Sequence, residues 1–435
     1  MLRRTFLNVL AGGAVLAQQS KGRPARAAAP ELSNEKIVIL GGGFAGAQTA
    51  SNIKRIMPQV DVTLVEKHDR FVIGPLVFDY LFGGSEFDQI TVEYEGLRRR
   101  GIRVVTTEVL DVDPTRRSVQ TADGMLPYTR LVLAGGARFA HEAIEEWPGE
   151  AAGNLCIYDR KNLAELRERI AELDNETIIV GIPDSRIVCP PAPYEFVLLL
   201  AERIRRKQLA AKIVVLDAGV GPQPQPLSDR FSREISQFKG IIEYVDSIGA
   251  IQTVDPAQKL VRTKFGDEFA YSWLSVIPQG TASSFVRNLD LAEVPGGTFA
   301  AVDPLSMRTA KHHDIFAVGD MAQTPYGKSA FAAVTCADIC ARQLAVDLET
   351  AQADQSRVVN VACYPHIDAQ TALSMKVRYE FAPDSSSDHL QSSVRVGDAD
   401  HANLEERRQW LDTAIAGAFG RPTGPLVDSQ VIRKE

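Results

Sequence analysis

Cys189 and Glu195, near the middle of the chain, have the side-chain types and the spacing for thiol redox chemistry. Cys189 is followed by Pro190 and Pro191, which forbid a helix at the cysteine, and from Tyr194 onward apolar residues recur at helical spacing. Cys189 therefore lies just ahead of a helix N-terminus, where we expect the helix dipole to lower the pKa of the thiol. Glu195, in the first turn, either relays a proton near the sulfur or simply complements the dipole.

The other cysteines and the histidines carry weaker patterns. The short segment around Cys363 does not by itself indicate a function. For both Cys363 and Cys189, the alternative to a redox role is a free thiol packed in the core. Cys336 and Cys340 are four apart on a predicted helix over 329–348, so we expect them to pack together in the core. The chain has no C-x-x-C-H, so it attaches no c-type haem itself, and its seven histidines show no metal-ligand spacing.

A glycine-rich loop near the start of the chain predicts a dinucleotide site. The apolar run 36–40 is typical of a buried strand and 47–57 of a helix, and between them lies a G-x-G-x-x-G sequence. In this context the glycines allow a tight turn, close approach to a pyrophosphate at the helix N-terminus, and close packing of helix on strand. The loop residues predicted to hold the cofactor are Gly41, Gly43, Phe44, Ala45 and Gly46.

An acidic residue follows at the distance this kind of site requires. A second strand over 60–65 ends in Glu66, twenty residues after Gly46, where a carboxylate accepts from a ribose hydroxyl. Strand, loop, helix and acid thus occur in the order of a Rossmann unit. A purely structural glycine turn is the weaker alternative.

A later segment indicates which dinucleotide binds. The run from Thr309 to Asp320 resembles T-x6-F-A-x-G-D, the second flavin signature of the glutathione-reductase-like flavoproteins. The resemblance implies that Asp320, after Gly319, bonds the ribitol chain of FAD, and that Gly135 lies in the family's third short motif. Lys328 precedes a predicted helix aimed at the flavin, whose N-terminus would stabilise negative charge on the reduced ring.

The matching loop for a nicotinamide dinucleotide is altered. A strand over 177–180 runs into Gly181-Ile-Pro183, which is not G-x-G-x-x-G, and Pro183 removes an amide donor where a pyrophosphate needs one. Asp217 ends the next strand, but without the glycine loop we interpret it as a strand-end turn residue. The sequence predicts a second Rossmann-like unit that does not take electrons from NAD(P)H.

The segment Cys189-Pro-Pro-Ala-Pro-Tyr-Glu-Phe196 carries a family resemblance. It is similar to the flavoprotein subunit of flavocytochrome c sulfide dehydrogenase, in which C-P-P-x-P-Y-E supplies one half of a redox disulfide over the flavin, and the likeness covers essentially the whole mature chain. It implies that Cys363 is the second redox cysteine, that Glu195 relays a proton and that Trp410 lies at the flavin. It also implies that sulfide is oxidised and that a c-type cytochrome subunit accepts the electrons.

Two departures from that family keep alternatives open. Some of its members link FAD through a cysteine in the stretch that here is 70–76; no cysteine occurs there, so we expect non-covalent FAD. Cys156 resembles the extra cysteine of the sulfide:quinone oxidoreductases, a sister family, unless it is a packed thiol. A non-catalytic exported FAD-binding protein is the second alternative, which loss of Cys189 or Cys363 would have favoured, and neither is lost.

The N-terminal segment and the net charge indicate the compartment and partners. Arg3-Arg4, the apolar stretch after it and the small residues 25–29 resemble a twin-arginine export signal, so we expect a periplasmic protein in which a disulfide is permitted. The first 29 residues hold five basic residues and no acid, so the mature net charge changes from −7 to −12. That charge disfavours nucleic acid and favours a basic partner. No apolar run reaches the roughly 18 residues of a membrane span.

These elements together predict an α/β protein. We expect two Rossmann-like FAD/NAD(P)-type domains of the glutathione-reductase-like flavoprotein class and a C-terminal α+β interface domain. The expected parts are a signal peptide over 1–29, an FAD-binding domain over 30–141 and 283–352, a second Rossmann-like domain over 142–282 and the C-terminal domain over 353–435.

Overall fold

The computed structural model describes most of the chain. The described residues are 32–141, 144–292, 297–352, 356–382 and 390–420. The predicted export signal therefore lies outside the described residues. Within these ranges no helix combines the length and apolar character of a membrane span.

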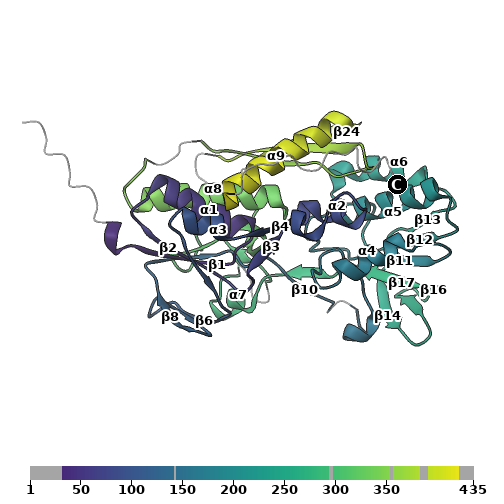
Figure 1. Cartoon of the computed structure of the whole chain (residues 1–435), viewed down its shortest axis with the longest axis horizontal. Coiled ribbons are helices and arrows are strands. Elements are labelled where there is room, and N and C mark those ends of the chain that lie inside the picture. The colour runs from purple at the N-terminus through teal and green to yellow at the C-terminus, as the bar shows by residue number, and fades with distance from the viewer. Residues whose placement is uncertain (1–31, 142–143, 293–296, 353–355, 383–389, 421–435) are drawn as a thin grey trace, which may run out of the picture. The chain divides into compact units, whose positions relative to one another are not determined.

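A five-stranded parallel sheet forms the first unit (Figure 1). Its apolar strands are buried on both faces, as a parallel sheet requires. Helix α1 (Phe44–Ile56) packs against α8 (Ala330–Asp347), and a small antiparallel sheet shares the core of the other face. The five strands in spatial order are β20 (Ile315–Ala317), β9 (Arg130–Leu133), β1 (Lys36–Leu40), β2 (Asp61–Glu66) and β5 (Arg103–Thr106). The small sheet consists of β6 (Val109–Asp113), β7 (Ser118–Thr121) and β8 (Gly124–Pro127).

The second unit repeats this plan with four parallel strands. Nine residues separate β11 (Thr177–Ile182) from helix α5 (Ala192–Lys207), which packs against β11 and β12 (Lys212–Asp217). Two extended segments, β10 (Arg138–Ala140) and β18 (Gln279–Thr281), pair where the chain passes between the two units. The four strands in spatial order are β13 (Ile242–Val245), β12 (Lys212–Asp217), β11 (Thr177–Ile182) and β17 (Trp273–Val276). The antiparallel strands covering the other face are β14 (Ile251–Asp255), β15 (Leu260–Thr263) and β16 (Glu268–Ala270).

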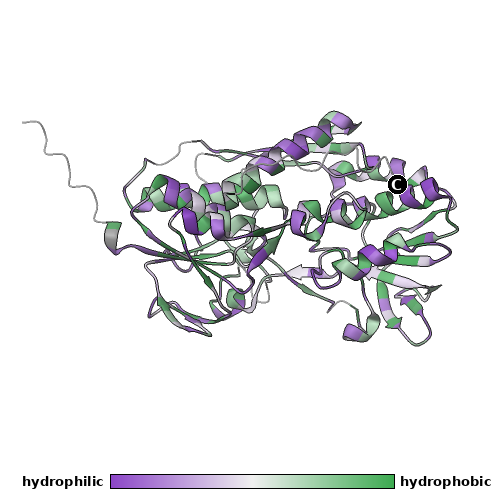
Figure 2. Cartoon of the chain, in the orientation of Figure 1, coloured by the Kyte–Doolittle hydropathy of each residue, from purple (hydrophilic) through white to green (hydrophobic). Residues whose placement is uncertain are grey.

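The C-terminal part returns to the first unit. Three antiparallel strands, β22 (Val358–Cys363), β23 (Ala372–Glu380) and β24 (Gln391–Asp400), lead into α9 (His401–Phe419). The Asp400 side chain accepts from the Ala402 amide and caps α9, which packs on α1. Figure 2 shows hydrophobic residues on the strands of both sheets, while hydrophilic positions gather on outer helices such as α9.

One arginine fastens the C-terminal end of α9. Arg100 follows the short helix α3 (Glu95–Arg99) and donates to the carbonyls of Gly417 at 2.5 Å and Ala416 at 2.8 Å, and to the Ser51 hydroxyl at 2.7 Å. The last carbonyls of a helix lack internal partners, and a guanidinium supplies several donors in a fixed fork. Arg100 therefore joins α3, α1 and α9.

We predict that Arg100→Met lowers the free energy of unfolding by about 2 kcal/mol, because hydrogen bonds from a charged group to partly buried carbonyls are lost. Urea unfolding measures the change. Arg99→Met is the matched control, since Arg99 lies on the same helix, is 61% exposed and has only a 3.9 Å ion pair with Glu95. It is expected to stay within about 0.5 kcal/mol of the parent. Equal effects of the two variants would contradict a role of Arg100 in holding α9.

Candidate active site

A cavity of about 400 Å³ brings the three parts of the chain together. Its volume falls in the range of cofactor and small-molecule sites. The walls combine the glycine loop, the start of α8, the segment around Cys189 and the C-terminal strands and helix. Predicted site residues that line the cavity are Gly43, Phe44, Ala45, Cys189, Glu195, Asp320, Cys363 and Trp410.

The glycine loop has the shape that a pyrophosphate requires. Gly41 has φ +111°, and a Cβ there would lie 2.4 Å from the Ala134 carbonyl oxygen. A Cβ on Gly46 would lie 1.9 Å from the Gly41 oxygen, so neither position admits a side chain. Gly43 precedes α1 and makes no side-chain cap, which leaves the first amides of that helix pointing at the cavity. These residues fit a dinucleotide phosphate.

Two side chains frame this loop. The Glu66 carboxylate accepts from the amides of Gly42 at 2.8 Å and His68 at 3.1 Å, at the end of β2 where a ribose is expected. Arg160 lines the cavity from the second unit, and its guanidinium donates to the Arg70 carbonyl at 3.2 Å. Sequence reasoning missed Arg160 because it lies in a loop without a motif. Its charge suits the phosphates.

The Asp320 segment lines the same cavity as the Cys189 segment. Burial raises the pKa of Asp320 to about 6, and the nearby Lys328 ammonium opposes the rise. Lys328, predicted at the cofactor, does not line the cavity. Its ammonium donates to the backbone carbonyls of Asp320 at 2.9 Å and Ala322 at 3.0 Å and lies over the Phe299 ring. Lys328 therefore supports the Asp320 loop from behind.

Two predicted residues, Gly135 and Gly319, do not line the cavity but are next in sequence to residues that do. Gly135 donates its amide to the Met321 sulfur at 3.0 Å, and Gly319 opens the turn that carries Asp320. Ser329 caps α8 by accepting from the Ala332 amide at 3.1 Å, so the N-terminus of α8 faces the cavity as predicted from its sequence. Phe331 in its first turn stacks on Trp410, with 5.0 Å between ring centroids.

Cys189 and Cys363 are thiols that line the same cavity. Cys189 has φ +49°; its amide donates to the Lys328 carbonyl at 2.8 Å, and its carbonyl accepts from the Ala192 amide at 2.9 Å. The lowered pKa predicted for Cys189 is wrong. Burial raises the pKa of Cys189 well above its usual value and that of Cys363 to about 12, with Glu195 adding to both shifts. Desolvation of a thiolate outweighs the partial charge of one helix end.

Glu195 is the acid closest to this chemistry. Its side chain is only 6% exposed, and its carboxylate accepts from the His366 amide at 2.8 Å. Burial raises the pKa of Glu195 to about 7, opposed by Arg407 and by the His366 amide. A carboxyl with this pKa exchanges a proton near neutral pH, as general acid–base work requires.

The other three thiols lie away from the cavity wall. Cys156 is 4% exposed and does not line the cavity, although its neighbours Ile157 and Tyr158 do. Cys336 and Cys340 are buried in α8, as their spacing predicted. Burial raises the pKa of Cys156 to about 12. In the described part of the chain no three His, Cys, Asp or Glu side chains cluster to hold a metal ion.

In the second unit, the residues that correspond to a dinucleotide site make their contacts within that unit. Strand β11 continues through Gly181 and Ile182, so these residues belong to the sheet and not to a loop as predicted; Gly181 lies between Leu216 and Val276 in the ladder. Asp217 is fully buried. Its carboxylate accepts from the Tyr194 hydroxyl at 2.8 Å, the Tyr244 hydroxyl at 2.5 Å and the Gly219 amide at 2.9 Å. The Gly219 bond is the turn role predicted for Asp217.

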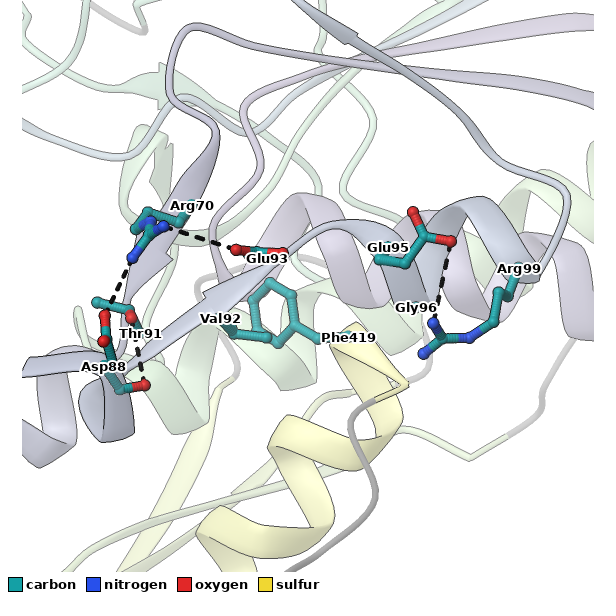
Figure 3. A pocket seen from close by; sticks show the side chains of 9 residues that line it. All are labelled: Arg70, Asp88, Thr91, Val92, Glu93, Glu95, Gly96, Arg99 and Phe419. Atoms are coloured by element: carbon teal, nitrogen blue, oxygen red, sulfur yellow. Dashed lines mark hydrogen bonds and ion pairs between the residues drawn. The ribbon is translucent and has the colours of Figure 1, made fainter.

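A second cavity, of about 380 Å³, lies beside the end of α9 (Figure 3). Its charged side chains pair with one another: Arg70 contacts Asp88 at 3.1 Å and Glu93 at 3.6 Å, while Arg99 lies 3.9 Å from Glu95. These arginines already have carboxylate partners. Neither of the predicted redox cysteines lines this cavity.

Two family models each match part of the chain. The model described as pyridine nucleotide-disulphide oxidoreductase matches 35–181, and the central part of the sulfide dehydrogenase (flavocytochrome c) flavoprotein chain matches 164–278. The solved sulfide:quinone oxidoreductase of Aquifex aeolicus is similar with a TM-score of 0.68 at 16% identity, covering 89% of this chain and 93% of that one. The chain has the pyridine nucleotide-disulphide oxidoreductase fold. The predicted fold class is confirmed.

Two curated relatives match at low sequence identity. The sulfide-quinone reductase of Aquifex aeolicus is 25% identical over 182 residues, which is 41% of each chain. The mitochondrial sulfide:quinone oxidoreductase of Dictyostelium discoideum is 24% identical over 316 residues, 70% of this chain and 69% of that one. With the fold and the phosphate loop described above, the cofactor is FAD, as predicted.

We predict that Glu195→Gln stabilises the protein relative to the parent as pH rises. Because the pKa of Glu195 is raised from 4.5 to about 7, the folded chain holds more protons than the unfolded chain between these values, and parent stability falls as pH rises through them. The variant cannot ionise, so its stability relative to the parent should increase by roughly 1–3 kcal/mol between pH 4.5 and pH 8. Unfolding measured across this range checks the trend, with the exposed Glu165→Gln as the substitution control. A stability difference between Glu195→Gln and the parent that does not change with pH would contradict the prediction.

Proposed function

We propose that the protein is an FAD-dependent oxidoreductase that oxidises sulfide or a related sulfur compound through a Cys189–Cys363 redox disulfide. The observation that carries the proposal is that these two cysteines, from separate parts of the chain, line one cavity with Asp320 and the glycine loop. The match to the flavocytochrome c sulfide dehydrogenase model and the similarity to sulfide:quinone oxidoreductases support the substrate.

The chemistry follows from the residues around the disulfide. A hydrosulfide attacks one sulfur, the bond between the cysteines breaks, and a persulfide forms on one cysteine and a thiolate on the other. Glu195, with its pKa near neutral, takes the proton that the attacking sulfur gives up. FAD, when bound, supplies the acceptor for the two electrons. The apolar residues Phe71, Val188 and Phe331 in the wall exclude water around these sulfurs.

The proposal includes non-covalent FAD and no role for NAD(P)H. No cysteine occurs over 70–76, where Phe71, Gly74 and Pro75 line the cavity. The loop after β11 lacks the glycines of a phosphate loop, and the two tyrosines on Asp217 occupy a strand-end carboxylate that a ribose would need. Electrons therefore enter from a sulfur compound.

The acceptor we propose is a c-type cytochrome on a separate subunit, in the periplasm. The twin-arginine pattern, the mature charge of −12 and the flavocytochrome model support this choice. A quinone is the second candidate, supported by the names of the similar sulfide:quinone oxidoreductases. The position of Cys156 behind the cavity wall favours the cytochrome over an enzyme that needs a third cysteine. Retention of both cavity cysteines disfavours a non-catalytic FAD-binding protein.

We predict that Cys189→Ser and Cys363→Ser each keep FAD but lower the rate of anaerobic flavin bleaching by sulfide about a hundredfold or more, because the disulfide that accepts the sulfur is gone. Stopped-flow absorbance measures the rate. Cys156→Ser is the matched control and should bleach like the parent, whereas NADH should leave the flavin oxidised. Bleaching of Cys363→Ser at the parent rate, with Cys156 essential, would show that the pairing is wrong.

We further predict that sulfide-dependent cytochrome c reduction falls steeply between low salt and a few tenths molar salt. Docking through acidic side chains weakens when salt shortens the Debye length to about 8 Å at physiological ionic strength. The rate of haem reduction at a series of salt concentrations measures this, with sulfide bleaching alone as the control for salt effects on the flavoprotein. Fast reduction of a soluble quinone, with no cytochrome reduction at any salt, would instead assign a quinone acceptor.

A further inference from the structure

One buried cation in the cavity has no role in the chemistry described so far. Arg407 lies on α9, lines the cavity and is only 8% exposed. Trp410, three residues further along the same helix face, lines the cavity as well. Arg407 thus shares the cavity with Trp410 and the two cysteines.

The guanidinium of Arg407 is short of anionic partners. It donates to the Pro75 carbonyl, and none of the described carboxylates lies within ion-pair distance of it. The neighbouring Arg408, by contrast, pairs with Glu405 at 2.6 Å. A buried charge without an ionised partner destabilises the folded chain, so its retention in a cavity indicates a role in binding an anion there.

Two acids lie within electrostatic reach of Arg407, and neither forms an ion pair with it in the described part of the chain. Burial raises the pKa of both Asp79 and Glu195, which favours their neutral forms, and Arg407 opposes each rise. Its field also favours the thiolate of Cys363. The cavity therefore presents a positive charge beside a sulfur that must become negative when a disulfide opens.

We propose that Arg407 is the anion-binding residue of this cavity, whose guanidinium binds the anionic sulfur substrate beside Cys363 and stabilises the sulfur anion formed when the disulfide opens. The proposal rests on the proposed function for the identity of the anion, but anion binding itself does not. It explains how a site with two half-buried thiols of raised pKa accommodates negative sulfur.

Alkylation of the reduced, FAD-loaded protein tests the proposal without sulfide. Dithiothreitol reduces the disulfide and is removed; iodoacetate or iodoacetamide then reacts with the thiols. In both reactions a sulfur–carbon bond forms and iodide leaves, so the reagents differ chiefly in charge. Peptide mass spectrometry gives the rates at Cys363 and Cys189, and the ratio of the iodoacetate rate to the iodoacetamide rate cancels changes in thiolate fraction. Cys156 in the same samples reports reaction outside the cavity.

We expect Arg407→Met to lower this ratio at Cys363 about tenfold, since one nearby charge is lost in a partly desolvated site. Arg407→Lys should restore most of it, and Arg408→Met, which removes a charge from the same helix outside the cavity, should leave it unchanged. An unchanged ratio in a folded, FAD-loaded Arg407→Met protein would overturn the proposal. Arg407 would then have only a structural role, through its hydrogen bond to the Pro75 carbonyl.

If Arg407→Met loses FAD or fails to fold, a measurement on the parent protein alone tests the proposal. Its ratio at Cys363 should exceed the ratio in the urea-unfolded chain by about tenfold, because unfolding removes the cation from the cysteine. A ratio equal to that of the unfolded chain would overturn the proposal. If sulfide does not bleach the parent but the raised alkylation ratio at Cys363 is observed, the anion site stands and the proposed function is rejected. If sulfide bleaches the parent but the alkylation ratio does not depend on Arg407, the proposed function stands and the anion site is rejected.

Discussion

The packing of α1 against both α8 and α9 is the contact on which the site depends. Small residues of α1, among them Ala47 and Ala50, are fully buried and let the other helices approach. Polar bonds fix the arrangement: Gln48 donates to Asp338 of α8, and the Ser51 hydroxyl donates to the Ala418 carbonyl of α9 at 2.8 Å. Helix α1 begins at the glycine loop, the start of α8 lines the cavity, and α9 carries Trp410. The contact among these helices therefore assembles three walls of one cavity.

Burial sets the chemistry inside that cavity. A helix end contributes a partial charge of about half a unit, whereas removing a thiolate from water shifts its pKa by several units. The same desolvation that raises the pKa of Cys189 and Cys363 also raises the pKa of Glu195 to about 7. Arg160 and Arg407 bring positive charge into the same cavity.

The second Rossmann-like unit shows how a fold is kept while its binding groups take other roles. The strand-end Asp217 bonds Tyr194 from α5 and Tyr244 from β13, so it joins elements of its own unit. The start of α5, which would face a nicotinamide dinucleotide, instead places Cys189, Ala192 and Glu195 at the flavin cavity. A Rossmann-like topology therefore does not by itself determine what the unit binds.

Local sequence determined the elements and their order, because a G-x-G-x-x-G loop, a strand-end acid and a proline-flanked cysteine each restrict the backbone within a few residues. The strands, α1, α5, α8 and the cofactor follow from such patterns. Tertiary structure alone decided which side chains share a cavity: that Cys363 lies with Cys189, that Cys156 and Lys328 lie behind the wall, and that Arg160 and Arg407 enter it. The pKa of Cys189 was mispredicted for the same reason, since burial depends on contacts between residues far apart in the chain, which no local pattern specifies.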